Sequence, residues 1–414
     1  MRLLHTSDWH LGQTLHDFER DYEHQAFLDW LLDTLATEQV DVLLIAGDIF
    51  DNSNPSAAAQ KQFYRFLTAA KQRIPHLNIV IIAGNHDSPG RLEAPAPLFA
   101  AFDATAVGYV TRDAHGDIDL DRLVTPLRNR TGEIAAWALA IPFLRPGDVP
   151  SVEAEGDRYL KGVELLYRQA LDQAVSRREP GQAIIALGHC HMSGGQTSED
   201  SERPIVIGGL EKLPVEMFDP AIAYVALGHL HRAQQVGGQT RVRYSGSPLP
   251  MSFTEINYRH QVVRVDLDGD SVAEIMSIPV PRSVALLRVP EQPAPIDEAL
   301  DALNALDLPD APSSDTWPYL QVRVQSNTFD RTLRTRIESI LEKKPVQLAH
   351  IERSSPLRGD RSTVAFQSID EIKRLEPAGI FKELCLQELQ REPSAELLAA
   401  FAELLTADDE GMAP

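Results

Sequence analysis

Each of five apolar runs in the chain ends in side chains that can bind metal ions. The run ends read SDWH (7–10), AGDIFD (46–51), AGNHD (83–87), LGH (187–189) and LGHLH (227–231). Carboxylate oxygen, amide oxygen and imidazole nitrogen together suit a hard-to-borderline divalent ion. The candidate ligands are Asp8, His10, Asp48, Asn85, His189, His229 and His231. Seven ligands are too many for one four-coordinate ion, so the pattern indicates two ions that share a carboxylate.

The position of these residues supports one common site. In an open parallel sheet the ligand crevice lies beyond the carboxyl ends of the strands, which is where each motif falls. A glycine precedes four of the motifs, and we expect it to let the backbone approach the ions closely. In Asp8-Trp9-His10, alternate residues of an extended segment would point the same way and share one ion. His229 and His231 could share an ion in the same manner or reach two neighbouring ions.

Each motif alone also has an ordinary structural explanation. AGD is a common helix-capping turn, and the histidines of GHLH could lie on the surface. The ordered repetition after five apolar runs favours the metal site. We expect His191 at the edge of the pocket rather than on an ion, because the site is already full, and the oxygen-rich set argues against Cys190 as a soft ligand. The remaining histidines near the N-terminus are expected to be structural or peripheral: His5, His16 and His24.

The elements that must position these side chains are those of an α/β protein. The apolar runs read as strands covered on both faces, with amphipathic helices over 20–36 and 159–175. Residues 240–248 are expected to form an antiparallel strand, and 260–278 a hairpin. Strands 284–289, 319–325 and 346–352 alternate with helices near 296–307 and 329–342. The predicted domains are a catalytic domain (1–279), a small α/β domain (280–353), a linker (354–376) and C-terminal helices (377–414).

Composition limits the class of protein. The formal net charge of −21 argues against unaided, tight, nonspecific binding to nucleic acid. No stretch approaches a membrane span, the N-terminus lacks a signal peptide, and the two cysteines imply no disulfide framework. We therefore expect a cytoplasmic protein. The sequence contains no G-x-x-x-x-G-K-[ST] loop, so any dependence on ATP must come from another subunit.

The motif series DWH, GDIFD, GNHD, GH and GHLH resembles the calcineurin-like metallophosphoesterases. That resemblance implies a sandwich of two mixed β-sheets flanked by helices. The phrases LLHTSDWHLGQTL, HQAFLDWLL, GNHDSPGRL and YSGSPLPMSF are similar to the SbcD family, the nuclease subunits of bacterial SbcCD complexes. The likeness is strong over 1–275 and looser through the small domain and the tail.

The resemblance implies roles for individual residues. One ion would be held by Asp8, His10, Asp48 and His231, and the other by Asp48, Asn85, His189 and His229, with Asp48 as the bridge. His86 would lie at the scissile phosphate, stabilising the transition state or protonating the leaving oxygen, and Asp51 would orient it. The family prefers manganese, although the ligand set alone would equally allow iron, cobalt or zinc.

The implied function is a metal-dependent exonuclease and endonuclease that processes DNA ends and hairpins in recombination and repair. The implied partner is an SbcC-like coiled-coil ATPase, with this chain as a homodimer within a heterotetramer. The small domain would cap the catalytic crevice and recognise DNA. The tail would dock on the ATPase through two apolar stripes at helical spacing: Ile380, Phe381, Leu384, Cys385 and Leu389, then Leu397, Leu398, Phe401, Leu404 and Leu405.

Two other functions remain open at this point. A small-molecule phosphodiesterase or phosphatase would use the same core, because the fold supports many substrates. A metal-stabilised scaffold without catalysis would need the ligands but not the additional histidine His86. The sequence leaves exonuclease polarity, the preferred DNA end and the metal used in the cell undetermined.

Overall fold

The computed structural model describes residues 1–100, 102–153, 157–198, 212–309, 313–326 and 330–354, together with residues 381, 382, 393, 394, 397, 398 and 401. The chain divides into two units, residues 1–354 and residues 355–414. The metal-ligand candidates all belong to the first unit.

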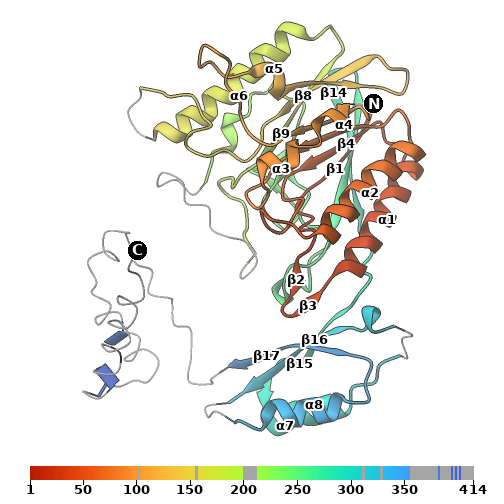
Figure 1. Cartoon of the computed structure of the whole chain (residues 1–414), viewed down its shortest axis with the longest axis vertical. Helices are drawn as coiled ribbons and strands as arrows, with labels where there is room; N and C mark the ends of the chain where they lie inside the picture. Colours follow the sequence, from red (N-terminus) through yellow and green to blue (C-terminus); the bar gives the residue numbers. More distant parts are fainter. Residues whose placement is uncertain are drawn as a thin grey trace. The chain divides into compact units, whose positions relative to one another are not determined.

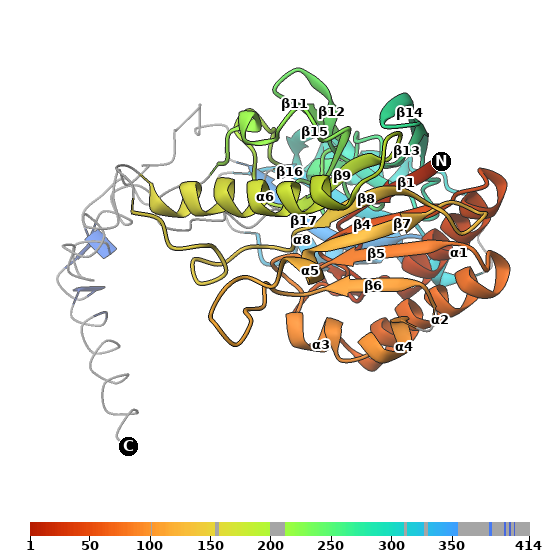
Figure 2. The ribbon, with the colours of Figure 1, turned by 90° about the horizontal axis from the view of Figure 1, so that it is seen from above.

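The first sheet has six strands in the order β14-β13-β1-β4-β5-β6. Its parallel part consists of β1 (Arg2–Thr6), β4 (Val42–Ala46), β5 (Asn78–Ile82) and β6 (Ala104–Val107). The hairpin of β13 (Gln261–Asp268) and β14 (Ser271–Pro279) completes it, with β13 antiparallel to β1. The carboxyl ends of β1, β4 and β5 therefore lie next to one another, as Figure 2 shows.

The second sheet also has six strands, in the order β11-β12-β10-β9-β8-β7. Its parallel strands are β8 (Ile134–Ala140), β9 (Ala183–His189), β10 (Tyr224–Gly228) and β12 (Gln239–Tyr244), and its edges are the antiparallel β7 (Val124–Arg128) and β11 (Gln234–Val236). The expected antiparallel strand over 240–248 is β12. It is antiparallel to β11 but parallel to β10, so that expectation was right for one neighbour and wrong for the other.

The two sheets pack face to face, and helices cover the outside. Along β4, Val42, Leu44 and Ala46 belong to the core between the sheets. The alternate residues Leu43 and Ile45 belong to the core beneath the helices. Because successive side chains of a strand point to opposite faces, a strand covered on both sides must be apolar throughout. The predicted α/β sandwich of two mixed sheets is confirmed.

The covering helices are α1 (Asp21–Thr37) and α2 (Ala57–Arg73) on the first sheet, and α6 (Arg158–Arg177) on the second. Figure 1 shows α1 and α2 side by side. Ser56 caps α2 by accepting a hydrogen bond from the Ala59 amide at 3.1 Å, and Asp157 caps α6 through the Leu160 amide at 2.9 Å. The helices predicted over 20–36 and 159–175 are confirmed within two residues at each end.

Several short elements have no counterpart in the sequence analysis, because each is too short to show a periodic pattern. They are β2 (Thr14–Leu15), β3 (Phe18–Glu19), α3 (Pro89–Glu93), α4 (Ala96–Ala100), α5 (Leu120–Leu123) and the 3₁₀ turns η1 (Val215–Met217), η2 (Phe253–Glu255) and η3 (Ser314–Thr316).

A third sheet is built from the residues predicted to form a small α/β domain. Its strands β15 (Leu286–Pro295), β16 (Tyr319–Gln325) and β17 (Gln347–Ser354) are all parallel, with α7 (Ile296–Asn304) and α8 (Leu333–Leu341) between them. The predicted order of strands and helices is confirmed. This sheet has its own apolar core, and a further cluster joins Leu286 and Tyr319 to Leu15 and Phe253 of the sandwich. The domain limits given above stay predictions.

The predicted linker and C-terminal helices lie almost wholly outside the described residues. Within the part of the tail that is described, the rings of Phe381 and Phe401 stack with centroids 4.1 Å apart and an interplanar angle of 4°. Among the described helices none combines the length and apolarity needed to cross a membrane. The expected cytoplasmic location stays a prediction.

Candidate metal centre

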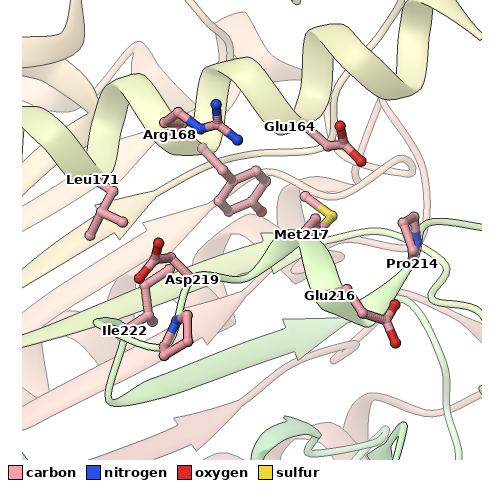
Figure 3. Close-up of a pocket in the computed structure, with 10 residues that line it drawn as sticks. Glu164, Arg168, Leu171, Pro214, Glu216, Met217, Asp219 and Ile222 are labelled. Carbon is pink, nitrogen blue, oxygen red and sulfur yellow. The ribbon is translucent and has the colours of Figure 1, made fainter.

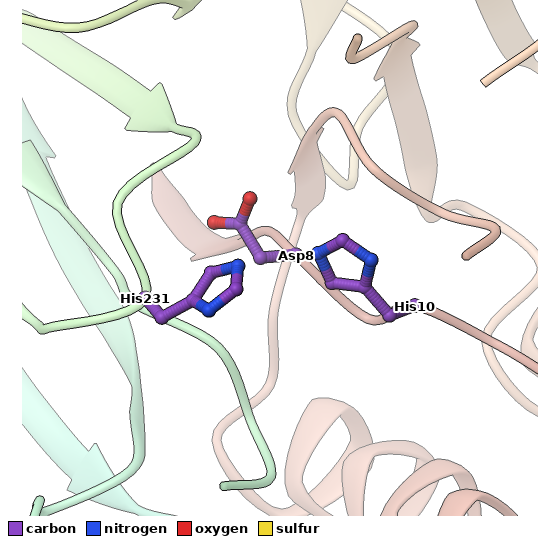
Figure 4. Close-up of side chains that lie close together, drawn as sticks. All are labelled: Asp8, His10 and His231. Atoms are coloured by element: carbon purple, nitrogen blue, oxygen red, sulfur yellow. The ribbon is translucent and has the colours of Figure 1, made fainter. Parts of the chain in front are cut away.

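Side chains from both large sheets converge on one buried centre. Three groups of side chains share members, and within each group the possible ligand atoms all lie within 4.8 Å of one another. The groups are Asp8, His10 and His231; His10, Asp48 and His86; and Asp8, Asp48 and His189. The residues follow β1, β4 and β5 of the first sheet and end or follow β9 and β10 of the second. Figure 4 shows three of these side chains close together: Asp8 and His10 from the loop after β1, and His231 from the loop after β10.

The loops after β1 and β4 run side by side, which brings Asp8, His10 and Asp48 together. The Asp8 amide donates to the Gly47 carbonyl at 3.0 Å, and the His10 amide donates to the Asp48 carbonyl at 3.0 Å. The backbone here is left-handed, with φ of 55° at Asp8, 47° at His10 and 51° at Asp48. The expectation that an extended segment aligns Asp8 with His10 is therefore wrong in its geometry, although the two side chains do meet.

Such left-handed positions are strained for residues other than glycine and persist when the surroundings hold them. Trp9 is one of the residues that keep this backbone in place. Its fully buried ring packs edge-on against Phe27, Phe63 and Phe66, and its Nε1 donates to Thr6 Oγ1 at 2.9 Å. The sequence shows Trp9 only as the residue between two candidate ligands.

The glycines before the motifs are required by the close approach of the strand ends. A Cβ atom on Gly84 would lie 2.1 Å from Asp48 Oδ1, and one on Gly228 would lie 1.9 Å from the Ala46 carbonyl oxygen. On Gly47, where φ is +90°, it would lie 2.3 Å from His189 Nδ1. The expectation that these glycines let the backbone approach the ions stays a prediction; the structure shows that they make room for neighbouring strand ends.

Asp48 lies between the two halves of the centre. Its Oδ2 is 3.3 Å from His189 Nε2 and 3.7 Å from His10 Nε2, and its Oδ1 accepts the His86 amide at 2.9 Å. Burial alone would raise the pKa of Asp48, but His189 and His10 outweigh burial and hold that pKa well below its ordinary value. A carboxylate that stays ionised between two imidazoles is suited to bridge two cations.

On one side of Asp48 lie His189, Asn85 and His229. His189 Nδ1 is 2.9 Å from the Ala46 carbonyl, which can only accept, so Nε2 is the nitrogen that faces the centre. Asn85 Oδ1 lies 3.0 Å from His189 Nε2 and 3.2 Å from His229 Nδ1. Burial lowers the pKa of His189, yet the Asp48 carboxylate more than offsets this and raises it to about 9. Burial and the neighbouring His189 lower the pKa of His229.

On the other side lie Asp8, His10 and His231. His10 Nε2 is buried and has no hydrogen-bond partner among the described residues. A buried polar atom without a partner is costly, and a cation would satisfy it. Asp8 is held by two contacts: Oδ2 accepts from Ser7 Oγ at 2.5 Å and Oδ1 from the His229 amide at 2.9 Å. The oxygen and nitrogen ligand atoms of these side chains, in their fixed orientations, fit divalent ions.

His86 and Asp51 meet through the backbone. His86 Nδ1 lies 2.6 Å from the Asp51 main-chain carbonyl, whereas the Asp51 carboxylate lies 3.6 Å from His10 Nδ1. The expected orientation of His86 by Asp51 thus has a main-chain contact that the sequence could not indicate. His86 also lies close enough to His10 and Asp48 to be counted with them as a ligand. Its role in chemistry rather than ligation stays a prediction.

Sequence reasoning missed the residues that hold the ligands. Asp87 accepts three main-chain amides, from Ile49, Phe50 and Gly84, which ties the loops after β4 and β5 together. Burial and the nearby Asp48 raise the pKa of Asp87 to about 6. Glu255, in the turn η2, lies 3.2 Å from His231 Nδ1. The only signal for Glu255 was its place just after the phrase YSGSPLPMSF.

The histidines and the cysteine that were not expected to bind metal lie outside the three ligand groups. The His191 ring lies 6.0 Å from that of His229, and His191 belongs to none of the three groups. The Cys190 thiol contacts Met192 Sδ at 3.6 Å, and burial raises its pKa to about 12. His16 stacks on His350 at 4.8 Å, and His5 and His24 are fully buried.

A separate cavity of about 270 Å³ lies between α6 and residues 214–222. Figure 3 shows Glu164 and Arg168 on the helix and Met217 and Asp219 on the opposite wall. None of the predicted ligands lines it, so it is not part of the metal centre.

Comparisons with known proteins agree with the arrangement. Residues 1–233 match the family described as calcineurin-like phosphoesterase. Residues 282–389 match the family described as type 5 capsule protein repressor C-terminal domain, SbcD_C.

Three relatives are named as the SbcD component of the nuclease SbcCD. The one from Rhodobacter capsulatus is 40% identical over 386 residues, covering 92% of this chain and 93% of the relative. The one from Escherichia coli K12 is 34% identical and covers 98% of each chain. The one from Bacillus subtilis 168 is 40% identical over 64% of this chain and 66% of the relative. The chain therefore belongs to the calcineurin-like phosphoesterases and, within them, to the SbcD family of nuclease subunits.

Proposed function

We propose that this chain hydrolyses the phosphodiester bonds of DNA at a centre of two divalent ions, as the nuclease component of an SbcCD-type complex. The observation that carries the proposal is the convergence of Asp8, His10, Asp48, His189 and His231 from two sheets on one buried centre. Membership of the family makes the chain a metal-dependent hydrolase. The substrate, DNA, is taken from the resemblance to nucleases of this family.

The geometry supports a division of the ligands between two ions. Asp8, His10 and His231 would hold one ion, and Asn85, His189 and His229 the other. Asp48 lies between the two sets and would bind both. The mixed oxygen and nitrogen set suits manganese, which we propose as the working ion.

Two such ions, when bound, supply Lewis acidity, a water nucleophile of lowered pKa and charge neutralisation in an in-line phosphoryl displacement. The Ala46 carbonyl lies on Nδ1 of His189, and the Glu255 carboxylate lies 3.2 Å from Nδ1 of His231, so Nε2 of each is the nitrogen that would face an ion. His86 is held at Nδ1 by the Asp51 carbonyl. Its other ring nitrogen, Nε2, would donate to the leaving 3′ oxygen when it is protonated.

We propose that the partner is an SbcC-like coiled-coil ATPase, bound by the C-terminal residues 377–414, and that the chain forms a homodimer within a heterotetramer. The sequence has no phosphate-binding loop, so any dependence of the activity on ATP must come from another chain. In such a complex the substrates would be DNA ends and hairpins.

We further propose that the small α/β domain limits which DNA shapes reach the centre. Its removal would be a poor test, because Val284, Leu286 and Tyr319 pack in one cluster with Leu15 and Phe253 of the sandwich. Substitution of exposed residues on α7 and α8 would test the role without exposing that cluster. Such variants should change the preference between single-stranded and duplex DNA while binding metal as before.

The alternative, a phosphodiesterase for small molecules, is tested by comparing substrates. The full chain, with and without a co-expressed SbcC-like partner, is assayed with Mn²⁺ on linear and hairpin DNA and on a chromogenic phosphodiester. We expect cleavage of DNA, enhanced by the partner. Hydrolysis of the small ester without any cleavage of DNA would favour the alternative.

Asp48→Ala tests the centre itself. It removes the bridge, so both ions and all cleavage should be lost. Asp270→Ala, at an exposed hairpin tip, is the matched control and should change neither. Metal analysis that found two ions still bound to Asp48→Ala would contradict the assignment.

A further inference from the structure

We propose that Glu255 is a positioning residue of the metal centre, which holds His231 in the one tautomer that can bind an ion. The inference rests on the proposed two-ion function and deepens it. No motif of the family resemblance included Glu255.

Glu255 is buried in a way that needs an explanation. It is fully inaccessible to solvent, and burying a carboxylate is costly unless its oxygens are paired. Oε1 lies 3.2 Å from His231 Nδ1, and Oε2 accepts the Met251 amide at 2.9 Å. Both oxygens are therefore satisfied, and one of them is committed to a histidine of the centre.

The contact decides which nitrogen of His231 can act as a ligand. An ionised carboxylate only accepts hydrogen bonds, so Nδ1 must carry the hydrogen and Nε2 must carry the lone pair. A protonated Glu255 would donate instead, and Nε2 would then carry the hydrogen and be unable to bind metal. A carboxylate on the second nitrogen also makes an imidazole more basic and fixes its ring plane.

The turn that carries Glu255 is itself held in place. Ser252 Oγ accepts the Thr254 amide at 3.2 Å, and the Ser252 carbonyl accepts the Glu255 amide at 3.2 Å. Arg288, on β15 of the small sheet, donates from Nη2 to the Phe253 carbonyl at 2.5 Å. His231 is fixed from its own side, because its carbonyl accepts the Ser247 amide at 3.0 Å. Glu255 and His231 are thus each anchored independently, as a preorganised site requires.

The other histidines of the centre show why Glu255 stands apart. His189 has a neutral carbonyl, that of Ala46, on the nitrogen that faces away from the centre. Asp51 lies 3.6 Å from His10 Nδ1, outside hydrogen-bond range, and its side chain is one-third exposed. Of these three histidines, only His231 has a wholly buried carboxylate outside the ligand set on one of its nitrogens.

The test measures metal binding rather than activity. Glu255→Gln and Glu255→Ala full-length proteins are stripped of metal and titrated with Mn²⁺ at neutral pH. Calorimetry reports the affinity of each site, and electron paramagnetic resonance reports whether two ions are coupled. Loss of such a supporting contact typically weakens metal affinity about 10–100-fold. We expect that loss at one of the two sites in Glu255→Ala, and a smaller loss in Glu255→Gln, whose amide oxygen can still accept from Nδ1.

Glu93→Gln is the matched control. Its carboxylate is also largely buried and also accepts one main-chain amide, from Gly108 at 2.7 Å, and one side-chain donor, Arg122 at 2.7 Å. It contacts no histidine of the centre, so its loss should lower thermal stability and leave both Mn²⁺ affinities unchanged.

Three results would overturn the inference: both Glu255 variants binding two ions as tightly as wild type, both sites weakening equally, or Glu93→Gln weakening them as much. If Glu255→Ala does not fold, the size-conserving Glu255→Gln decides. Wild-type protein that binds fewer than two ions would instead overturn the proposed function, so the two failures are distinguishable.

Discussion

His86 differs from the other histidines of the centre in how it is held. Its Nδ1 meets the Asp51 carbonyl and its amide meets Asp48 Oδ1, so both its ring and its backbone are fixed at the edge of the site. It is also only half-buried, whereas His10 and His189 are nearly inaccessible. A group that must reach a substrate needs such exposure, and a ligand does not.

We therefore predict that His86→Ala retains both ions and loses most turnover. Positioned proton transfer is typically worth about 10²–10⁴-fold, and the loss in kcat should fall in that range. Metal analysis and single-turnover cleavage of a DNA end measure the two quantities on one preparation. If the variant lost its ions together with its activity, His86 would be a ligand and the scheme would be wrong.

At the residue scale the sequence predicted which side chains meet, but not how they are held. Asp8, His10 and Asp48 could be found because residue type and position after an apolar run are local properties. Their left-handed backbone could not be foreseen, since those conformations are imposed by neighbours distant in sequence. Glu255 was missed for the same reason: only the fold brings it to His231, across 24 positions of sequence.

At the scale of elements, the ends of β4 and β10 approach so closely that a side chain has no room. A Cβ on Gly228 would lie 1.9 Å from the Ala46 carbonyl oxygen, so Gly228→Ala must separate the two sheets locally. We predict a loss of stability of about 1–3 kcal/mol or more, together with weaker Mn²⁺ binding, because His229 follows directly. Urea unfolding and Mn²⁺ titration measure the two effects.

Gly147→Ala is the control for that prediction. A Cβ at Gly147 would meet nothing within 4 Å, and its φ is not in the left-handed region. This variant should be as stable as wild type within about 0.5 kcal/mol. Equal stability and metal affinity in Gly228→Ala would show that the strand ends can move apart freely.

The elements themselves were largely predictable, and their pairing was not. Continuous apolar runs identified β4, β5, β9 and β10, since a strand covered on both faces has no polar side. The parallel pairing of β12 with β10 was missed because strand order is not encoded by any local period. The order of strands and helices in the small sheet was predicted because they alternate with clear patterns, although β15 extends to Pro295, beyond the predicted end at 289.

At the scale of the whole molecule, His5 links the two large sheets. It lies on β1, yet its Nδ1 is 2.9 Å from Tyr224 Oη and its Nε2 is 3.1 Å from the Leu227 carbonyl, both on β10. Burial, more than the charge of Arg243, lowers the pKa of His5 to about 3. Below pH 6.5, His5 of the unfolded chain binds a proton, whereas His5 of the folded protein stays neutral. The free energy of unfolding therefore falls as the pH decreases toward 3.

We predict that His5→Gln flattens this dependence. A histidine whose pKa is lowered in this way decreases the free energy of unfolding by about 1.4 kcal/mol for each pH unit between its unfolded and folded pKa values. The variant has no histidine at position 5 and should lack this contribution. Urea unfolding from pH 6.5 to 4.5, with a chelator present so that metal binding does not contribute, measures the slope. His115→Gln, at an exposed position, should keep the wild-type slope. An unchanged slope in His5→Gln would mean that His5 titrates normally in the folded protein.

For the C-terminal residues 377–414, the sequence pattern is still the main basis for prediction. Helices as short as the two predicted for the tail are only marginally stable in isolation and need to pack against another surface. Among the described residues of the tail, Phe381 of the first stripe stacks on Phe401 of the second. We propose that the pair so formed lays its remaining apolar face into a groove of an SbcC-like coiled-coil partner.

Substitution of both Leu398 and Phe401 by Asp should then abolish co-purification with that partner, because buried aromatic residues dominate such interfaces. The isolated variant should keep its melting temperature and both ions, since the sandwich and the metal centre lie in residues 1–354. Val175→Asp, at an apolar residue that is 43% exposed on α6, is the matched control and should leave the complex intact. A complex that survives the double substitution would place the partner elsewhere on the chain. A double variant that unfolds would show that the tail packs on its own sandwich.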